Sequence, residues 1–286
     1  MAKKYGLIID ITRCDGCGSC LIAVKDEYAI NDYPGYSAPL PMEGVNLLDL
    51  KEIEQGQHWK VKMDYIPVMF PHNRNQGPVP GAPEGAVYTR EDGITIIDPV
   101  KAKGCKAIYD YFEAKYPGTC YWNEELQLCQ TYILDAHRLD EGERLTRCAE
   151  SCPTQALHWG DYNDPDSEVS QFIAEHGEDS LEDYFQEEGA DFVVRYYKLP
   201  KPFITGEVLR EDLPNDCVEG AKVTCKSKCE SVRETETNFF GDFEFMYLTK
   251  GGEYEVTIEL DGYESRTIDV KLDEATDLGT VVLTKK

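Results

Sequence analysis

Two groups of cysteines, far apart along the chain, constrain this sequence more than any other feature. The first group is Cys14-x2-Cys17-x2-Cys20, and the second is Cys148-x3-Cys152, which a proline follows directly. The chain has eleven cysteines in all, and an odd number cannot pair completely within one chain. Clustered cysteines of this kind are typical of metal binding rather than of a disulfide framework. The fold must therefore present metal-ligating thiolates from at least one tight loop.

The spacing of these cysteines indicates an iron–sulfur cluster. Bacterial ferredoxins use the run C-x2-C-x2-C-x3-C-P, and in ferredoxins with two clusters the fourth cysteine ligates the other cluster. Here the fourth position after Cys20 holds Val24, so Cys14, Cys17 and Cys20 need a remote fourth thiolate. Cys152, which precedes a proline, is the natural donor. We therefore predict one [4Fe–4S] cluster on these four cysteines, with zinc or a loop that has lost its metal as alternatives.

The composition and charge of the chain exclude several classes of partner. With 286 residues, 41% of them hydrophobic and 29% charged, the chain is long enough for one large or two ordinary globular domains. A net charge of −25 argues against nucleic acid and anionic membranes as partners, because both are negative. The first apolar run is short and ends at Asp10, unlike a signal peptide. We expect no direct membrane insertion and a cytoplasmic location.

The first part of the chain predicts short strands, helices and ordered loops. Asp92-Gly93 between two apolar runs is a strong hairpin signal, and Asp166 or Ser167 is placed to cap a helix. Apolar runs, turn residues and charge patterns predict, in chain order, a strand over 5–11, a helix over 21–28, a Pro/Gly-rich loop over 64–83, a hairpin over 85–99, helices over 100–114 and 136–147, and two acidic helices over 165–189.

The pattern of apolar and polar residues changes near residue 200. From there to the end, short runs of alternating apolar and polar residues are separated by turn formers. This pattern predicts a small antiparallel β-sandwich of the immunoglobulin or transthyretin type. The expected fold class is therefore α+β. It consists of a ferredoxin-like iron–sulfur domain with long loops over residues 1–200, followed by a β-sandwich domain over residues 201–286.

Several stretches besides the cysteines carry a family resemblance. They are Cys14–Cys20, Asn31–Tyr36, Gly85–Ile94, Ile97–Pro99, Tyr121–Glu125, Arg147–Cys152, Gly160–Pro165, Gly220–Val223 and Thr237–Phe243. Together they resemble the iron–sulfur (β) subunits of molybdopterin oxidoreductases of the dimethyl-sulfoxide-reductase group. Because the similarity continues through the sandwich tail, it favours the transhydroxylase branch of that group. The resemblance implies a large catalytic partner that carries a molybdenum or tungsten bis-pterin cofactor, and it leaves open a higher oligomer of such heterodimers.

The chain departs from the family pattern at most of the other cysteine motifs. Family members carry four motifs and several clusters. The second motif should fall near Pro67–Asn73, where this chain has no cysteine, and only Cys120 lies near the third. The fourth motif begins with Cys129, but Tyr132 stands where its partner should be. These losses predict that one cluster persists and the others are absent.

A second, unusual cluster is the open alternative. The neighbouring cluster would retain Cys129 and Cys148, and two thiolates do not hold a cubane. Cys105 or Cys120 would have to join them. In the sandwich tail, Cys217, Cys225 and Cys229 are expected to be free thiols, with Cys225 and Cys229 as less favoured metal ligands.

No combination of residues in this chain predicts organic catalysis, so the active site is expected on the large subunit. The first functional hypothesis is an accessory subunit of a transhydroxylase-like enzyme that acts on phenolic or related small substrates. Such a reaction is redox-neutral overall, so it does not require an unbroken chain of clusters. The second hypothesis is an electron-transfer subunit of a molybdopterin reductase, hydroxylase or dehydroxylase with an external redox partner. The third is a purely structural subunit.

Overall fold

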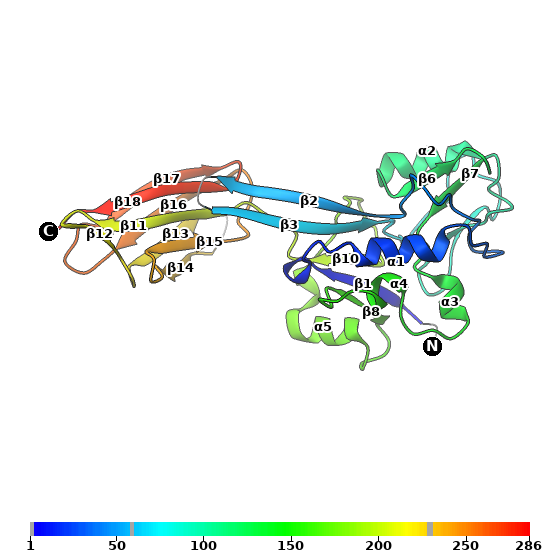
Figure 1. The fold of residues 1–286 in the computed structure, drawn as a ribbon, viewed down its shortest axis with the longest axis horizontal. Helices are drawn as coiled ribbons and strands as arrows, with labels where there is room; N and C mark the ends of the chain where they lie inside the picture. The colour runs from blue at the N-terminus through cyan, green and yellow to red at the C-terminus, as the bar shows by residue number, and fades with distance from the viewer. Residues whose placement is uncertain (1–2, 58–59, 228–230) are drawn as a thin grey trace. The chain divides into compact units, whose positions relative to one another are not determined.

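The chain folds into two compact units that do not correspond to two simple halves of the sequence. The computed structural model describes residues 3–57, 60–227 and 231–286, which are mostly strands with few helices (Figure 1). Unit 1 contains Met1–Glu52 and Asp64–Leu199, and unit 2 contains Ile53–Met63 and Pro200–Lys286. The chain therefore passes between the units after Glu52, after Met63 and after Leu199.

A four-stranded sheet forms the centre of unit 1. In spatial order its strands are β8 (Leu157–Asp161), β1 (Tyr5–Asp10), β10 (Val194–Tyr197) and β9 (Leu181–Glu182). Strand β1 is buried along its whole length, and it pairs antiparallel with β8 and parallel with β10. Helix α5 (Glu168–His176) covers the sheet, and its Val169 and Phe172 pack with Ile8 of β1. The strand predicted over residues 5–11 is therefore confirmed, and it lies at the centre of the sheet.

Short helices and hairpins complete unit 1. They are the 3₁₀ turns η1 (Ile11–Arg13) and η2 (Glu178–Ser180), helices α1 (Ser19–Tyr28), α2 (Lys106–Lys115), α3 (Ala136–Asp140) and α4 (Arg147–Glu150), and the hairpins β4–β5 (Val87–Thr89 and Thr95–Ile97) and β6–β7 (Cys120–Asn123 and Leu128–Thr131). The predicted helix over 21–28 and the hairpin over 85–99 are confirmed. Among the described residues, no helix has the length and apolar character needed to cross a membrane.

Three of the predicted helices in unit 1 need correction. The helix predicted over 100–114 begins only at Lys106. The helix predicted over 136–147 ends at Asp140, shortly before Gly142, whose φ of 101° is incompatible with a right-handed helix. Of the two helices predicted over 165–189, only α5 forms, because Gly177 with φ 81° and ψ 144° ends it. Ser167 does cap α5, since its side chain accepts from the Ser170 N–H.

The prediction of a loop over residues 64–83 is wrong for the first part of this range. Strands β2 (Leu48–Gln57) and β3 (Lys60–Met69) form a two-stranded sheet, so residues 64–69 belong to a strand. Pro67, which suggested a loop, lies inside β3. A two-stranded sheet has only edge strands, where proline is tolerated because one side of each strand needs no ladder donor. The part of this hairpin that includes the connection between the two strands, Ile53–Met63, belongs to unit 2.

Unit 2 is a sandwich of two four-stranded sheets. One sheet contains β12 (Leu213–Cys217), β11 (Ile204–Arg210), β15 (Asp242–Phe245) and β18 (Thr276–Leu283), and the other has the order β14 (Arg233–Glu236), β13 (Lys222–Ser227), β16 (Gly252–Glu259) and β17 (Arg266–Leu272). Apolar side chains from both sheets form one core, in which Val208 and Phe243 of the first sheet join Val223 and Val256 of the second. The predicted sandwich is therefore confirmed.

One pairing in the sandwich differs from the prediction. The sequence predicted antiparallel strands throughout, but β11 and β18 run parallel. These strands are far apart in the sequence, and a parallel pair needs a long connection, which the intervening strands provide. Alternation alone defines which face a residue occupies and contains no information about strand direction.

Candidate metal centre

The antiparallel pairing of β1 and β8 brings the two cysteine groups together. Ile9 of β1 lies opposite Leu157 of β8, and the Asp10 N–H donates to the Ala156 carbonyl at 2.8 Å. Because the strands run in opposite directions, the loop that leaves β1 and the loop that enters β8 lie at the same end of the sheet (Figure 1). The first loop carries the C-x2-C-x2-C group, and the second carries Cys152.

Two glycines shape the first cysteine loop. Gly16 and Gly18 have φ values of 75° and 72°, in the left-handed region that side chains disfavour. Gly16 also lies under the ring of Tyr65, since a Cβ on Gly16 would be only 2.5 Å from that ring. A Cβ on Gly18 would meet no atom within 4 Å. The loop therefore requires glycine at residue 16 for two independent reasons and at residue 18 for one.

The two glycines supply a matched test of this loop. We expect Gly16→Ala to lower both thermal stability and the amount of iron bound, because the backbone strain of about 1 kcal/mol is added to a steric conflict. Gly18→Ala should cost only the backbone strain. Iron per chain and the unfolding temperature of both variants measure the difference. Equal losses in the two variants would show that Tyr65 does not restrict the loop, and Tyr65→Ala in the Gly16→Ala background should recover part of the loss.

The pKa values of Cys14 and Cys20 are both raised, mainly by burial and in part by other thiols of the predicted ligand set. Burial raises the pKa of Cys20 to about 12, and the neighbouring thiols of Cys14, Cys152 and Cys17 raise it further. Burial is also the main cause of the raised pKa of Cys14, with contributions from Cys152 and Cys17. Thiolates this close to one another repel, so a positively charged centre is required for all of them to ionise together.

Hydrogen-bond donors point toward these sulfur atoms. The Ala156 N–H donates to Cys152 Sγ at 3.2 Å. Backbone hydrogen bonds from Gly16 and Leu21 oppose the rise in the pKa of Cys14 and Cys20, respectively. Such N–H to sulfur bonds stabilise thiolates and are a main means by which proteins tune iron–sulfur clusters. Four soft sulfur donors with these partners fit the chemistry of an iron–sulfur cluster.

The arrangement differs from that expected around a single ion. Within residues 3–57, 60–227 and 231–286, no group of three or more His, Cys, Asp or Glu side chains is placed to hold one metal ion. A cubane binds its four thiolates at four separate iron atoms, so its ligands lie farther apart than those of one ion. Binding of a cluster by the four cysteines therefore stays a prediction.

The candidates for a second cluster occupy three different environments. Cys120 and Cys129 lie on one face of the β6–β7 hairpin, where burial and a hydrogen bond to Cys129 raise the pKa of Cys120. The Cys105 thiol contacts the Gly81 carbonyl at 3.4 Å. Cys148, in α4, is fully buried. The structure thus brings Cys120 and Cys129 together, and a second cluster on the four cysteines stays a prediction.

A buried hydrogen-bond network surrounds Cys148. The sequence analysis did not predict this network. The hydroxyls of Tyr28 and Tyr132 donate to the carboxylate of Asp135 at 2.8 and 2.7 Å, and the Arg147 N–H donates to it at 2.6 Å. The Tyr132 hydroxyl also lies 3.4 Å from Cys148 Sγ. Burial raises the pKa of both tyrosines, so they remain donors. The sequence signal was Tyr132 itself, which stands three residues after Cys129.

The sandwich cysteines do not form a site in the part of the chain that the structure describes. Cys225 is buried in the sandwich core and Cys217 is exposed. Cys229, the proposed partner of Cys225, lies outside the described residues, as does His58. The alternative of a metal bound by Cys225 and Cys229 therefore stays a prediction.

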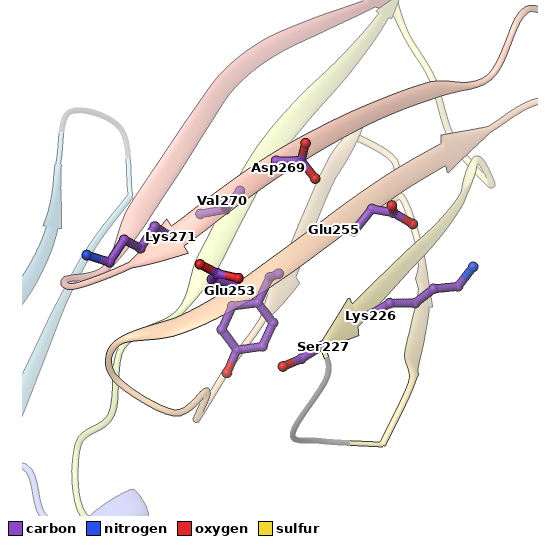
Figure 2. A pocket seen from close by; sticks show the side chains of 8 residues that line it. Lys226, Ser227, Glu253, Glu255, Asp269, Val270 and Lys271 are labelled. Carbon is purple, nitrogen blue, oxygen red and sulfur yellow. The ribbon is translucent and has the colours of Figure 1, made fainter.

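An open hollow lies at the second sheet of unit 2, lined by exposed charged side chains and by the core residues Tyr254 and Val270 (Figure 2). Its described lining comes from β13, β16 and β17. Lys226 lies opposite Glu255, Glu255 opposite Asp269, and Glu253 opposite Lys271. Two of these three pairs join opposite charges, which is typical of a solvent-exposed sheet face. The hollow contains none of the cysteines considered above and belongs to unit 2.

Comparisons with known proteins find relatives for the sandwich and for most of the chain. Residues 204–284 match the family described as a carboxypeptidase regulatory-like domain. The chain is 32% identical over 204 residues to the iron–sulfur subunit of a putative dimethyl sulfoxide reductase of Halobacterium salinarum, covering 66% of this chain and 76% of that one. It is 28% identical over 204 residues to a subunit of the tetrathionate reductase of Salmonella typhimurium, covering 71% and 75% of the two chains.

These relatives and the meeting of the two cysteine loops define the class of protein: the chain belongs to the iron–sulfur subunits of molybdopterin oxidoreductases. Within that family its similarity extends over the whole chain to one relative, the pyrogallol hydroxytransferase small subunit of Pelobacter acidigallici. The two are 33% identical over 284 residues, which cover 98% of this chain and 100% of the other. The family resemblance inferred from the sequence is confirmed, and a large catalytic partner is implied.

Proposed function

We propose that this chain is the iron–sulfur accessory subunit of a heteromeric molybdenum or tungsten enzyme that resembles pyrogallol hydroxytransferase. Cys14, Cys17, Cys20 and Cys152 would hold one [4Fe–4S] cluster, which supplies one-electron chemistry when bound. The observation that carries this proposal is the β1–β8 pairing, which brings the loop that contains Cys152 to the same end of the sheet as the first cysteine loop. The catalytic bis-pterin cofactor would lie on the large subunit.

The packing around Cys148 supports a single cluster. In the ferredoxin pattern, the residue at position 24 would ligate the neighbouring cluster, and here Val24 is buried in helix α1. Tyr132, at another expected ligand position, is fully buried and contacts Cys148. Tyr132 and Asp135 form a buried hydrogen-bonded environment beside Cys148, at a position where the family pattern has a ligand. Loss of the neighbouring cluster leaves a short electron path, which favours a redox-neutral hydroxyl transfer over exchange with an external carrier.

The other parts of the proposal concern architecture and location. We infer that unit 1 is a ferredoxin-type domain with degenerate cluster motifs and that the sandwich from residue 201 onward is a separate domain. Cytoplasmic location and higher oligomers of the heterodimer belong to the same proposal. The alternative function is an electron-transfer subunit with an external redox partner, and it is favoured by the exposure of Cys17, which brings one ligand to the surface.

Anaerobic iron analysis and a reductive titration of the purified complex test the proposal. We expect about four iron atoms per chain, in addition to any iron on the partner, and about eight would indicate two clusters. Turnover of a phenolic substrate without an external donor or acceptor would support the transhydroxylase-like function. Substrate-driven reoxidation of the reduced cluster at a catalytically competent rate would exclude a purely structural role. A chain purified anaerobically without iron would overturn the proposal.

A further inference from the structure

Two adjacent phenylalanines are exposed in the turn between β14 and β15 of the sandwich. Phe239 and Phe240 are 71% and 65% exposed, and their rings pack edge to face with centroids 5.4 Å apart. Among the described residues, they are the only two consecutive residues with exposed large apolar side chains. Phe243 and Phe245, which follow in β15, point into the core instead. Exposed aromatic side chains of this kind are enriched at protein interfaces.

Hydrogen bonds and a glycine fix the conformation of the turn that carries these two side chains. The Asn238 side-chain oxygen accepts from the N–H groups of Phe240 and Asp242 at 2.9 and 3.0 Å. Gly241 has a φ of 81°, and a Cβ there would lie 2.8 Å from the Val208 carbonyl oxygen. Only glycine fits this position. The phenylalanines are therefore presented on a pre-organised turn, which lowers the entropic cost of binding a partner.

Negative charges around the turn restrict what the partner can be. Asp242 flanks the turn and is exposed, as is Glu219, whose neighbour Val218 lies beside Gly241. Glu236, on the other flank, is exposed too and lies opposite Lys222. The whole chain carries a net charge of −25. A second copy of the chain and an anionic bilayer would both be repelled. The complementary surface is an apolar pocket with lysine or arginine at its rim on a different protein.

We propose that the Phe239–Phe240 turn docks into such a pocket on the large catalytic subunit. The inference rests on the proposed function, since it takes the large subunit as the partner. Similarity over the whole length to a small subunit indicates that unit 2 is part of the assembled enzyme. On docking, the two rings become buried and supply apolar contact. The flanking carboxylates orient the two subunits and increase the rate at which they associate.

An exposed cysteine beside the turn provides a direct probe. Cys217 is exposed, and its Cβ lies 3.6 Å from the position that a Cβ on Gly241 would occupy. A partner that covers the turn should also cover this thiol. Alkylation of Cys217 by a maleimide, located by mass spectrometry, should be fast in the free chain and slow in the assembled enzyme.

The experiment compares the double variant Phe239→Ser/Phe240→Ser with the wild-type chain, each co-expressed with the large subunit. We expect association to weaken at least about tenfold, and Cys217 to become as reactive as in the free chain. Higher salt should weaken the wild-type complex. Val100→Ser is the matched control, because Val100 is an exposed apolar loop residue of unit 1 with 80% of its surface accessible. Its association should be unchanged.

Iron content and thermal unfolding of the free variant verify that it is folded. Unchanged association with Cys217 equally reactive before and after assembly would overturn the inference while leaving the proposed function intact. The inference would also be overturned if the double variant still bound the large subunit but no longer associated with itself. The same holds if it still bound the large subunit but no longer bound phosphatidylcholine vesicles. A wild-type chain that binds no large subunit would overturn both proposals.

Discussion

Replacing Cys152 with serine is expected to lower bound iron from about four atoms per chain to less than about one. A serine hydroxyl is a poor replacement for a thiolate, and the three cysteines of the first loop cannot complete a cubane alone. The substitution should disturb the surrounding fold little, because serine can still accept the hydrogen bond that the Ala156 N–H donates to Cys152 Sγ at 3.2 Å. Iron and acid-labile sulfide, measured after anaerobic purification, check this expectation.

The matched control for this substitution is Cys217→Ser, which removes an exposed thiol of unit 2. It should retain the full iron content. Assembly with the large subunit should weaken in Cys152→Ser when the complex is measured by size-exclusion chromatography. Iron content in Cys152→Ser equal to that of the wild-type chain would mean that the remote ligand is misassigned.

Replacing Asp135 with alanine is expected to destabilise unit 1 by about 3–5 kcal/mol, because it leaves several buried donors without an acceptor. The hydroxyls of Tyr28 and Tyr132 and the Arg147 N–H all donate to this carboxylate. Each unsatisfied buried donor costs about 1–3 kcal/mol. Thermal unfolding of the free chain, followed by circular dichroism, measures the loss. A decrease in stability below about 1 kcal/mol would show that water replaces the carboxylate.

Asp135→Asn is the informative companion variant. It keeps an acceptor oxygen, and asparagine tolerates the left-handed backbone at this position, where φ is 55°. Burial raises the pKa of Asp135 in the folded chain, so the folded state holds this proton to higher pH than the unfolded state. The wild-type chain should therefore lose stability relative to Asp135→Asn as pH rises through the folded pKa. A pH-independent difference between the two would mean that Asp135 does not titrate differently on folding.

Most of the fold could be predicted where local signals and tertiary packing agree. The strand that becomes β1, the β4–β5 hairpin and the alternating strands of the sandwich were identified because their patterns match their final burial. The β2–β3 hairpin was missed, because no strand is predicted over residues 48–63 and the Pro/Gly-rich composition from residue 64 onward indicates a loop. The short helices were overestimated because charge patterns define a helical face but not its end, which Gly142 and Gly177 determine.

Cysteine spacing predicts the ligands of the candidate site, but it contains no information about their surroundings. Spacing alone nominated Cys152 as the remote ligand, and the pairing of β1 with β8 gives a structural reason for that choice. Nothing local in the sequence links Tyr65 to Gly16, since their contact depends on tertiary packing. The same holds for Tyr28 and Asp135, whose hydrogen bond joins residues 107 positions apart. Long-range partners of this kind require the assembled fold.

The segment Ile53–Met63 belongs with unit 2, although both of its flanks belong with unit 1. Its Lys60 forms an ion pair with Glu244 of the sandwich at 2.7 Å, and its Gly56 lies against the ring of Phe203. A fragment cut at Leu199 would therefore keep this segment but lose its packing partners. The complementary fragment from Pro200 would lack it. The two units are interleaved in the primary structure, so biochemical dissection requires an internal deletion together with a truncation.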